Sequence, residues 1–326
     1  MPYVGIDVDS AALVVARHDQ GAPERFANTP AGHRALVRWL QRQGPVQVCL
    51  EATGTYSLDV ARALHAASGI EVMVINPRAS KSFADALLTR SRDDTGDAMR
   101  LARFAASMPF MPWTPPSPAA LALRQIMREA MTLGDEVSAA KNRRHAVSQT
   151  RLTPKILLRA MDRHIREIET RIAELERAAL EMVRDNAGLA ADLDLIVTIT
   201  GFAERSALRV LGELATRFGP LDPRQIVAYA GLDVVHHTSG ISVDRKPHIS
   251  KRGNANLRRA LYMPALVAIR YDPAVGAFYR RLIAKGLEPL QAIAAVMRKL
   301  LHAISAVLRH RTPYDPQKLF KQTLPA

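Results

Sequence analysis

Short apolar runs separated by polar turns dominate the first 76 residues, and helical spacing of apolar residues takes over afterwards. The predicted strands cover residues 3–8, 12–18, about 24–28, 46–51 and 70–76, and the predicted helices cover residues 30–43, 57–67, about 78–88 and 94–107. Three early strands followed by alternating strands and helices predict an α/β domain with an RNase H-like sheet, in which the first strand pairs with the fourth.

The pattern changes after residue 108. Residues 109–118, "PFMPWTPPSP", contain five prolines in ten positions, which predicts a linker or a rigid strap. Two heptad-like apolar stripes follow, separated near Leu152–Pro154. They consist of Ile126, Ala130, Leu133, Val137 and Ala140, and of Ile165, Ile168, Ile172, Leu175, Ala179 and Met182. The stripes predict two helices that either pack on each other or form a coiled-coil contact between copies.

The remainder is predicted to be mainly helical. Residues 195–214 fit a helix, a Gly turn and a second helix, an arrangement whose backbone amides can hold a phosphate. Residues 240–261 predict a hairpin leading into a helix capped by Asn254 or Asn256. The expected domains are residues 1–108, a linker at 109–118, a coiled-coil-like spacer at 119–186, a C-terminal domain at 187–312 and a tail at 313–326.

Charge narrows the choice of partner. The chain has 326 residues, 45 Lys and Arg against 31 Asp and Glu, and a formal net charge of +14, which favours nucleic acid or an anionic membrane surface. We expect no signal peptide and no membrane span, because no segment shows the required apolar run. The single cysteine, Cys49, excludes an intrachain disulfide framework and a Cys-rich zinc site. These features predict a cytoplasmic protein that binds nucleic acid.

Four carboxylates stand out in this cationic chain. Asp7 shares a strand face with Gly5, and Glu51 ends the fourth strand, which is the predicted neighbour of the first. Asp94 and Asp97 lie one helical turn apart at the start of a helix. Leu101, Phe104 and Met108 continue that helix face and are expected to pack it against the sheet. The four acids are therefore predicted to converge.

Converging carboxylates raise each other's pKa, and divalent cations relieve the repulsion between them. Oxygen ligands suit Mg²⁺ or Mn²⁺, and two such ions can act on a phosphodiester. We therefore predict that the acids hold metal, while arginines in the same stretch bind DNA or RNA. Those arginines are Arg90, Arg92, Arg100 and Arg103. The alternative is that each acid is structural, with Asp94 capping its helix and Asp97 pairing with Arg100 or Arg103.

These motifs resemble a known family. The stretches "GIDV", "LEATGTY", "INPRASKSF" and "RDDTGDAMRLARF" are similar to the N-terminal domain of transposases of the insertion-sequence 110 family. The stretches "ITGFAERSALRVL", "AYAGLDVV", "TSGISV" and "ISKRGNANLRRAL" resemble the second domain of the same family. The resemblance spans nearly the whole chain, and the order and spacing of the motifs carry it.

The resemblance implies a RuvC-like domain with a DEDD metal site made by Asp7, Glu51, Asp94 and Asp97, and a nucleophilic serine, Ser239. It also implies DNA recombination through a phosphoserine link, guided by a structured RNA. Several cations within 20 residues of Ser239 are then expected to contact phosphates. They are Arg245, Lys246, Lys251, Arg252, Arg258 and Arg259. Because recombination joins several strands, we expect a homo-oligomer, either a dimer or a tetramer, with the heptad stripes as its contact.

Three other functions fit parts of the sequence. A RuvC-like metal nuclease or junction resolvase would use the four acids with water as nucleophile and leave Ser239 idle. A sugar-kinase or actin-like ATPase also has a "GID" strand, but it needs a duplicated domain and a second Gly-rich phosphate loop, and neither is present in the sequence. In a non-catalytic nucleic-acid-binding protein the carboxylates would be structural.

Overall fold

The protein is described by a computed structural model that covers residues 1–18, 21–54, 56–88, 94–216, 222–239 and 243–319. The side chains of residues 236–239, 243–246 and 319 lie outside this description. The chain divides into two compact units, Met1–Pro115 and Pro116–Ala326. Each unit is described by itself below.

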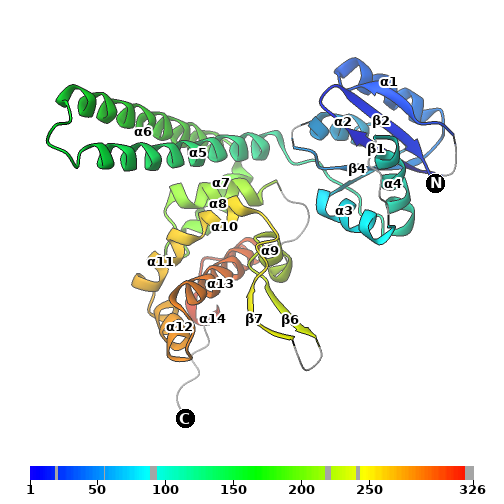
Figure 1. The fold of residues 1–326 in the computed structure, drawn as a ribbon. Helices are drawn as coiled ribbons and strands as arrows, with labels where there is room; N and C mark the ends of the chain where they lie inside the picture. Colours follow the sequence, from blue (N-terminus) through cyan, green and yellow to red (C-terminus); the bar gives the residue numbers. More distant parts are fainter. Residues whose placement is uncertain (19–20, 55, 89–93, 217–221, 240–242, 320–326) are drawn as a thin grey trace, which may run out of the picture. The chain divides into compact units, whose positions relative to one another are not determined.

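A five-stranded mixed sheet forms the centre of the first unit (Figure 1). Its strands are β1 (Tyr3–Val8), β2 (Ala12–Arg17), β3 (Glu24–Ala27), β4 (Val46–Glu51) and β5 (Ile70–Ile75). The strand order is β3-β2-β1-β4-β5, with β1–β2 and β2–β3 antiparallel and β1–β4 and β4–β5 parallel. The predicted pairing of the first strand with the fourth is confirmed.

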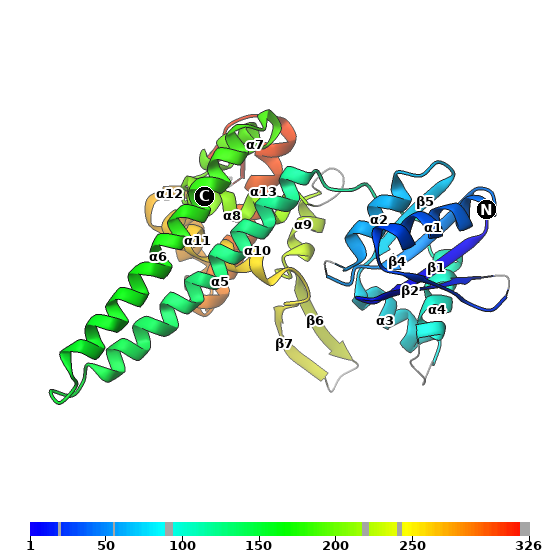
Figure 2. The same ribbon diagram turned by 90° about the horizontal axis from the view of Figure 1, so that it is seen from above.

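Helices cover both faces of this sheet (Figure 2). They are α1 (Pro30–Gln41), α2 (Tyr56–His65), α3 (Pro77–Ala86) and α4 (Asp94–Ser107). The face formed by Val4, Ile6 and Val8 of β1 packs against α1 and α2 in one apolar core. On the opposite face Cys49 and Met73 pack against Leu101 of α4. The first unit is therefore an α/β sandwich of three layers, which agrees with the predicted α/β domain.

Helix α4 begins where predicted and packs against the sheet through two of the three residues expected to do so. Leu101 is buried and Phe104 packs partly against the same apolar cluster. Met108, which was expected on that face, lies just beyond the helix and is 44% exposed. The prediction for Met108 is wrong because the helix ends at Ser107, one residue before it.

The proline-rich stretch acts as a strap along the first unit. The backbone N–H of Trp113 donates a 2.6 Å hydrogen bond to the carbonyl oxygen of Val72 on β5. Trp113 is 8% exposed, and its ring packs in the core with α2, edge-on to His65. Proline restricts the backbone of this segment, and the buried tryptophan fixes it to the sheet edge.

Two long helices open the second unit. They are α5 (Pro118–Val147) and α6 (Lys155–Arg184), which form the antiparallel hairpin seen in both views (Figures 1 and 2). Leu133, Val137 and Ala140 of α5 are buried against Ile165, Ile168 and Ile172 of α6. The two predicted stripes therefore pack on each other within one chain, which is the simpler of the two interpretations. A contact between copies stays a prediction.

The rest of the second unit is a helical body with one projecting hairpin. It contains α7 (Ala187–Val197), α8 (Glu204–Leu214), α9 (Pro223–Tyr229), β6 (Val234–Ser239), β7 (Val243–Ile249), α10 (Ala255–Ala260), α11 (Tyr262–Tyr271), α12 (Pro273–Ala284), α13 (Pro289–His310) and α14 (Pro316–Leu319). The predicted helix–turn–helix is present as α7 and α8, with Gly201 at φ 106° in the turn. The hairpin begins at Val234, six residues earlier than the predicted start at 240.

Helix α13 does not fit the expectation that no segment is apolar enough to span a membrane. It has 22 residues, and its most apolar stretch has a mean hydropathy of 1.3. Core helices of soluble proteins pass the same test, and 56% of that stretch is buried in this structure. Ile293, Val296, Leu300 and Ile304 pack in the main core of the second unit, so the apolar character of α13 is accounted for by packing.

Candidate functional site

The site in the first unit begins with a glycine on the central strand. Gly5 and Asp7 lie on the side of β1 that faces α4, and a Cβ at Gly5 would lie 2.0 Å from the carbonyl oxygen of Ala98. Only glycine therefore permits the backbone of α4 to lie directly on β1. This close approach brings the first turn of α4 to the end of β1, where Asp7 is partly buried.

The other three acids come from the two elements that flank Asp7. Glu51 is the last residue of β4, the parallel neighbour of β1, and is partly buried. Asp94 is the first residue of α4 and Asp97 lies one turn further along. Parallel strands end at the same edge of a sheet, so β1 and β4 place Asp7 and Glu51 at a common edge, beside the start of α4.

The other three acids act electrostatically on the carboxyl of Asp7. Burial, together with the negative charges of Asp97, Asp94 and Glu51, raises the pKa of Asp7 to about 6. A group of like charges with restricted access to water has this effect on a carboxyl. Glu51, Asp94 and Asp97 therefore lie near enough to Asp7 to act on its carboxyl, and a shared site made by the four acids stays a prediction.

Two arginines partly neutralise the group. Arg25 of β3 donates a 2.8 Å hydrogen bond to Asp94, and both side chains are exposed. Asp97 Oδ1 lies 2.7 Å from Arg100 Nη1, the pairing that the structural alternative predicts. That contact lacks hydrogen-bond geometry, so the buried Asp97 Oδ1 has no hydrogen-bond partner.

The carboxylate oxygens of these four acids are suitable ligands for a hard divalent cation, but in this structure they are too far apart to hold one together. Within the part of the chain that the structure describes, no three His, Cys, Asp or Glu side chains are close enough to hold one metal ion. The fit rests on two features of the carboxylates. Asp97 Oδ1 is buried without a hydrogen bond, and Asp7 would be relieved of repulsion by a cation. A cation would have to draw Asp94 and Asp97 away from Arg25 and Arg100.

Ser239 lies in the second unit, at the end of β6. Its backbone pairs with Val243 across the hairpin, and a register shift occurs between Val235 and His237. The Ser239 side chain and residues 240–242 lie outside the described residues. The structure therefore places the predicted nucleophile beside a hairpin turn and does not describe its hydroxyl.

The predicted phosphate-binding cations differ in their surroundings. Arg90 and Arg92 of the first unit, and the side chains of Arg245 and Lys246, are outside the described part of the chain. Lys251 and Arg252 are exposed between β7 and α10. Two others are engaged within the protein, because Arg258 Nη1 donates a 2.9 Å hydrogen bond to the Ala230 carbonyl oxygen and Arg259 binds both carboxylate oxygens of Asp135.

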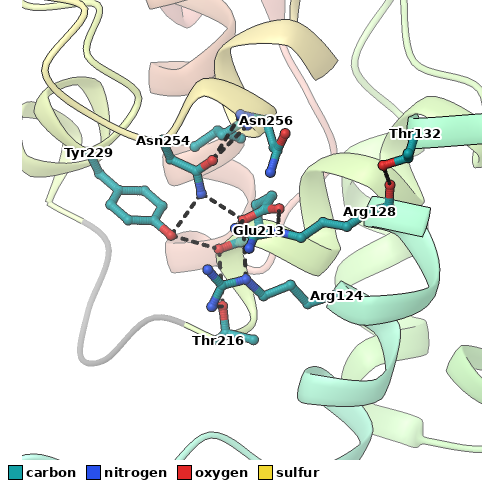
Figure 3. A network of polar contacts seen from close by, with 9 residues as sticks. Arg124, Arg128, Thr132, Glu213, Thr216, Tyr229, Asn254 and Asn256 are labelled. Carbon is teal, nitrogen blue, oxygen red and sulfur yellow. Dashed lines mark hydrogen bonds and ion pairs between the residues drawn. The ribbon is translucent and has the colours of Figure 1, made fainter. Parts of the chain in front are cut away.

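Sequence reasoning missed the buried carboxylate of Glu213. Its network of polar contacts reaches the segment that follows the β6–β7 hairpin (Figure 3). Glu213 of α8 is 2% exposed, and Arg128 of α5 donates hydrogen bonds of 2.6 and 2.9 Å to its two oxygens. Asn254 donates a third, 2.6 Å long. Arg124 Nε lies 3.4 Å from the same carboxylate. Burial opposes ionisation of Glu213, but these donors outweigh it and hold its pKa below the usual value.

Asn254 links the Glu213 network to the hairpin. Its side chain caps α10 by accepting hydrogen bonds from the backbone N–H groups of Asn256 and Leu257, which confirms one of the two predicted caps. Its Nδ2 group also donates to the hydroxyl of Tyr229 at 2.9 Å. The network therefore ties α5, α8 and α9 to the segment that leaves β7. The acidic residue in "VLGEL" was the only sequence signal, because a carboxylate amid apolar helix positions needs a buried partner.

Comparisons with known proteins agree along most of the chain. A family model described as "Transposase" matches residues 4–150, and one described as "Transposase IS116/IS110/IS902 family" matches residues 193–280. The pilin gene-inverting proteins of Moraxella bovis and Moraxella lacunata are each 28% identical over 322 residues, covering 96% of this chain and 97% of theirs. An uncharacterized 42 kDa protein of insertion element IS900 from Mycobacterium paratuberculosis is 27% identical over 203 residues, covering 61% of this chain and 49% of its own.

Proposed function

We propose that this chain, which belongs to the insertion-sequence 110 family of transposases, cuts and rejoins DNA through a covalent link between DNA and Ser239. The observation that carries the proposal is the similarity, along 96% of the chain, to proteins named for inverting a pilin gene. Inversion requires both cutting and rejoining, so it favours strand transfer over hydrolysis. The strand order of the first unit supports the assignment of an RNase H-like, RuvC-like fold.

In the proposed chemistry the four acids serve the phosphodiester. Asp7, Glu51, Asp94 and Asp97 would hold Mg²⁺ or Mn²⁺, which would draw negative charge from the phosphate oxygens. The chain itself contributes positioning, because Gly5 allows α4 to bring Asp94 and Asp97 beside Asp7. Arg25 and Arg100 pair with Asp94 and Asp97, and a bound cation would have to replace these pairs.

Ser239 supplies the covalent step. Its hydroxyl oxygen forms a bond to phosphorus while the bond from phosphorus to one DNA oxygen breaks. The serine proton is lost and the departing DNA oxygen gains one, so charge and atoms balance. The phosphoserine link keeps the energy of the broken bond, and a second DNA hydroxyl can reverse the step. This reversibility is what distinguishes rejoining from hydrolysis.

The partners follow from charge and family. A net charge of +14 favours DNA, with Arg92, Arg245, Lys246, Lys251 and Arg252 as phosphate contacts. The family resemblance adds a structured guide RNA and a homo-oligomer, a dimer or a tetramer. We place this activity in the cytoplasm.

The test is a comparison of covalent adducts. The full chain is incubated with labelled element-end DNA, Mg²⁺ and the cognate non-coding RNA, and the products are separated under denaturing conditions before and after protease treatment. We expect protein-linked DNA and joined product from the wild type and neither from Ser239→Ala. Ser138→Ala, on α5, is the matched control and is expected to match the wild type. Cleaved DNA from Ser239→Ala, with no adduct in any variant, would identify a hydrolytic nuclease.

A further inference from the structure

A large pocket lies in the second unit at the base of the β6–β7 hairpin. Its volume is about 1250 Å³. Its walls come from Val234 of β6, residues 247–249 of β7, α10, α11 and the first turns of α13. Typical small-molecule sites measure about 300–1,000 Å³. The pocket is therefore larger than one small ligand needs, and its size fits a short segment of a polymer.

Part of the wall is apolar and open to solvent. Tyr262 and Met263 at the start of α11 are 38% and 62% exposed, and Leu290 at the start of α13 is 67% exposed. These residues stand apart from the core of the unit, which buries the opposite sides of the same helices. Large apolar side chains gathered in a concave site are typical of binding surfaces.

Cations surround this apolar wall. Five Lys or Arg residues and one acid, Glu288, are among the described residues that line the pocket. The five are Arg209, Lys251, Arg258, Arg259 and Arg298. The Nε atoms of Arg209 and Arg298 are buried without a hydrogen-bond partner. Burial lowers the pKa of Arg209, and the positive charges of Arg205 and Arg259 lower it further, against the opposing effect of Glu176. The cations are therefore crowded, and an anion would relieve them.

We propose that this pocket binds an unstacked stretch of single-stranded nucleic acid. Apolar and aromatic side chains would receive the faces of the bases, and the surrounding cations would pair with the phosphates, as in proteins that bind single strands. Arg209 and Arg259 already pair with Glu176 and Asp135, and a protein segment would need acidic groups to neutralise the other three cations. A strand of nucleic acid carries a charge on every nucleotide, so it provides both complementary surfaces at once.

The pocket is also connected to the predicted nucleophile through one strand. Val234, in the wall of the pocket, begins β6, and Ser239 ends it. A six-residue strand spans roughly 17 Å. Bases held in the pocket would thus belong to a strand that passes within a few nucleotides of Ser239. The inference rests on the proposed function, since it assigns part of the nucleic acid that the reaction joins.

Binding is measured in a form of the full chain that cannot react. Ser239→Ala protein in chelator is titrated into fluorescein-labelled single-stranded DNA, single-stranded RNA of the same sequence, and duplex DNA, and anisotropy gives each Kd. Tyr262→Ala is expected to raise the Kd for single strands roughly tenfold. Its effect on duplex DNA is expected to be small, and Tyr262→Phe is expected to restore binding. The pocket is expected to hold the DNA strand that the reaction joins, so an effect of Tyr262→Ala on the RNA alone would contradict the assignment.

Two matched controls test whether a loss of binding arises from the pocket itself or from a general disturbance of the fold. Tyr271→Ala removes a second exposed tyrosine of α11 that lies outside the pocket, and it should leave all three affinities unchanged. Leu290→Glu places a negative charge in the pocket, whereas Leu152→Glu places one on a residue that is 90% exposed between α5 and α6. Leu290→Glu should weaken single-strand binding more than Leu152→Glu does, with circular dichroism confirming that both proteins are folded.

Two outcomes would overturn the inference, and a third would contradict only the proposed function. Equal effects of Tyr262→Ala and Tyr271→Ala would remove the stacking role. If Leu290→Glu bound single strands as Leu152→Glu does but lost an oligomer in sedimentation, the pocket would be a contact between copies of the chain. A chain that formed no covalent adduct but still bound single strands through Tyr262 would contradict the proposed chemistry alone.

Discussion

At the scale of single residues, Asp7 shows how the fold changes the acidity of one carboxyl group. Its carboxyl is partly buried among three other acids, and this environment raises its pKa to about 6. The same environment favours a divalent cation, because the cation interacts only with the ionised carboxylate. If Asp7 holds a metal ion as proposed, its proton release, metal binding and contribution to stability should depend on one another.

Replacing Asp7 should reveal this coupling as a change in the pH dependence of stability. The folded pKa lies above the unfolded value of 3.8. The contribution of Asp7 is thus fully present below about pH 4 and is lost as the pH rises through about 6. In chelator, Asp7→Asn should stabilise the protein at pH 8 by on the order of 1–3 kcal/mol and have little effect at pH 4. Urea unfolding at both pH values measures the difference.

Unfolding in the presence of Mg²⁺ distinguishes an effect of the Asp7 charge from a change in side-chain packing. At pH 8 the cation should raise the unfolding midpoint of the wild type, and the increase should be smaller in Asp7→Asn because one ligand has lost its charge. At pH 5 the wild type should also respond less, since most Asp7 is protonated there. An equal response of both proteins at pH 8 would show that Asp7 takes no part in metal binding.

At the scale of elements, the close contact between β1 and α4 determines whether the acids meet. A Cβ at Gly5 would lie 2.0 Å from the carbonyl oxygen of Ala98 and 2.4 Å from the backbone nitrogen of Ala102. Both are backbone atoms, so the helix as a whole would have to move. Asp94 and Asp97 would then move away from Asp7.

Gly5→Ala should therefore destabilise the protein and weaken its response to Mg²⁺. We expect a loss of about 3 kcal/mol or more, at the upper end of the cost of overpacking a core. Gly134→Ala, on α5, has nothing within 4 Å of the added Cβ and should stabilise its helix by about 0.5–1 kcal/mol. Urea unfolding of both variants makes the comparison. A Gly5→Ala protein as stable as the wild type would mean that α4 does not rest on β1 as described.

The accuracy of the sequence predictions follows how local each signal is. Strands β1 and β4 and helix α4 have the predicted bounds, because alternation and helical spacing act within a few residues. The start of β6 was missed, because the polar residues His236, His237 and Thr238 dilute its pattern. Glu213 could not be assigned from sequence, since its partners Arg128 and Asn254 lie 85 and 41 residues away.

At the scale of the whole molecule, the two units enclose separate apolar cores, and each has a local group of charges of a different sign. The first unit gathers carboxylates around Asp7, and the second surrounds its pocket with cations. Since each core is built from residues of one unit alone, we expect calorimetry to show two unfolding transitions. Mg²⁺ should shift the transition of the first unit and leave that of the second unchanged.

The substitution Glu213→Gln tests by calorimetry whether the second unfolding transition belongs to the second unit. It leaves Arg124 and Arg128 without their carboxylate and should lower the stability of the second unit by about 2–3 kcal/mol, less than for a fully buried pair because both arginines are partly exposed. Glu169→Gln removes an exposed partner of Lys141 in the same unit and should cost less than about 0.5 kcal/mol. The pKa of Glu213 is lowered, so its contribution is fully present above the ordinary value of 4.5 and is lost as the pH falls below that value through the lowered pKa. If Glu213→Gln shifted the transition that Mg²⁺ also shifts, the two units would unfold together, and stability could not be assigned to them separately.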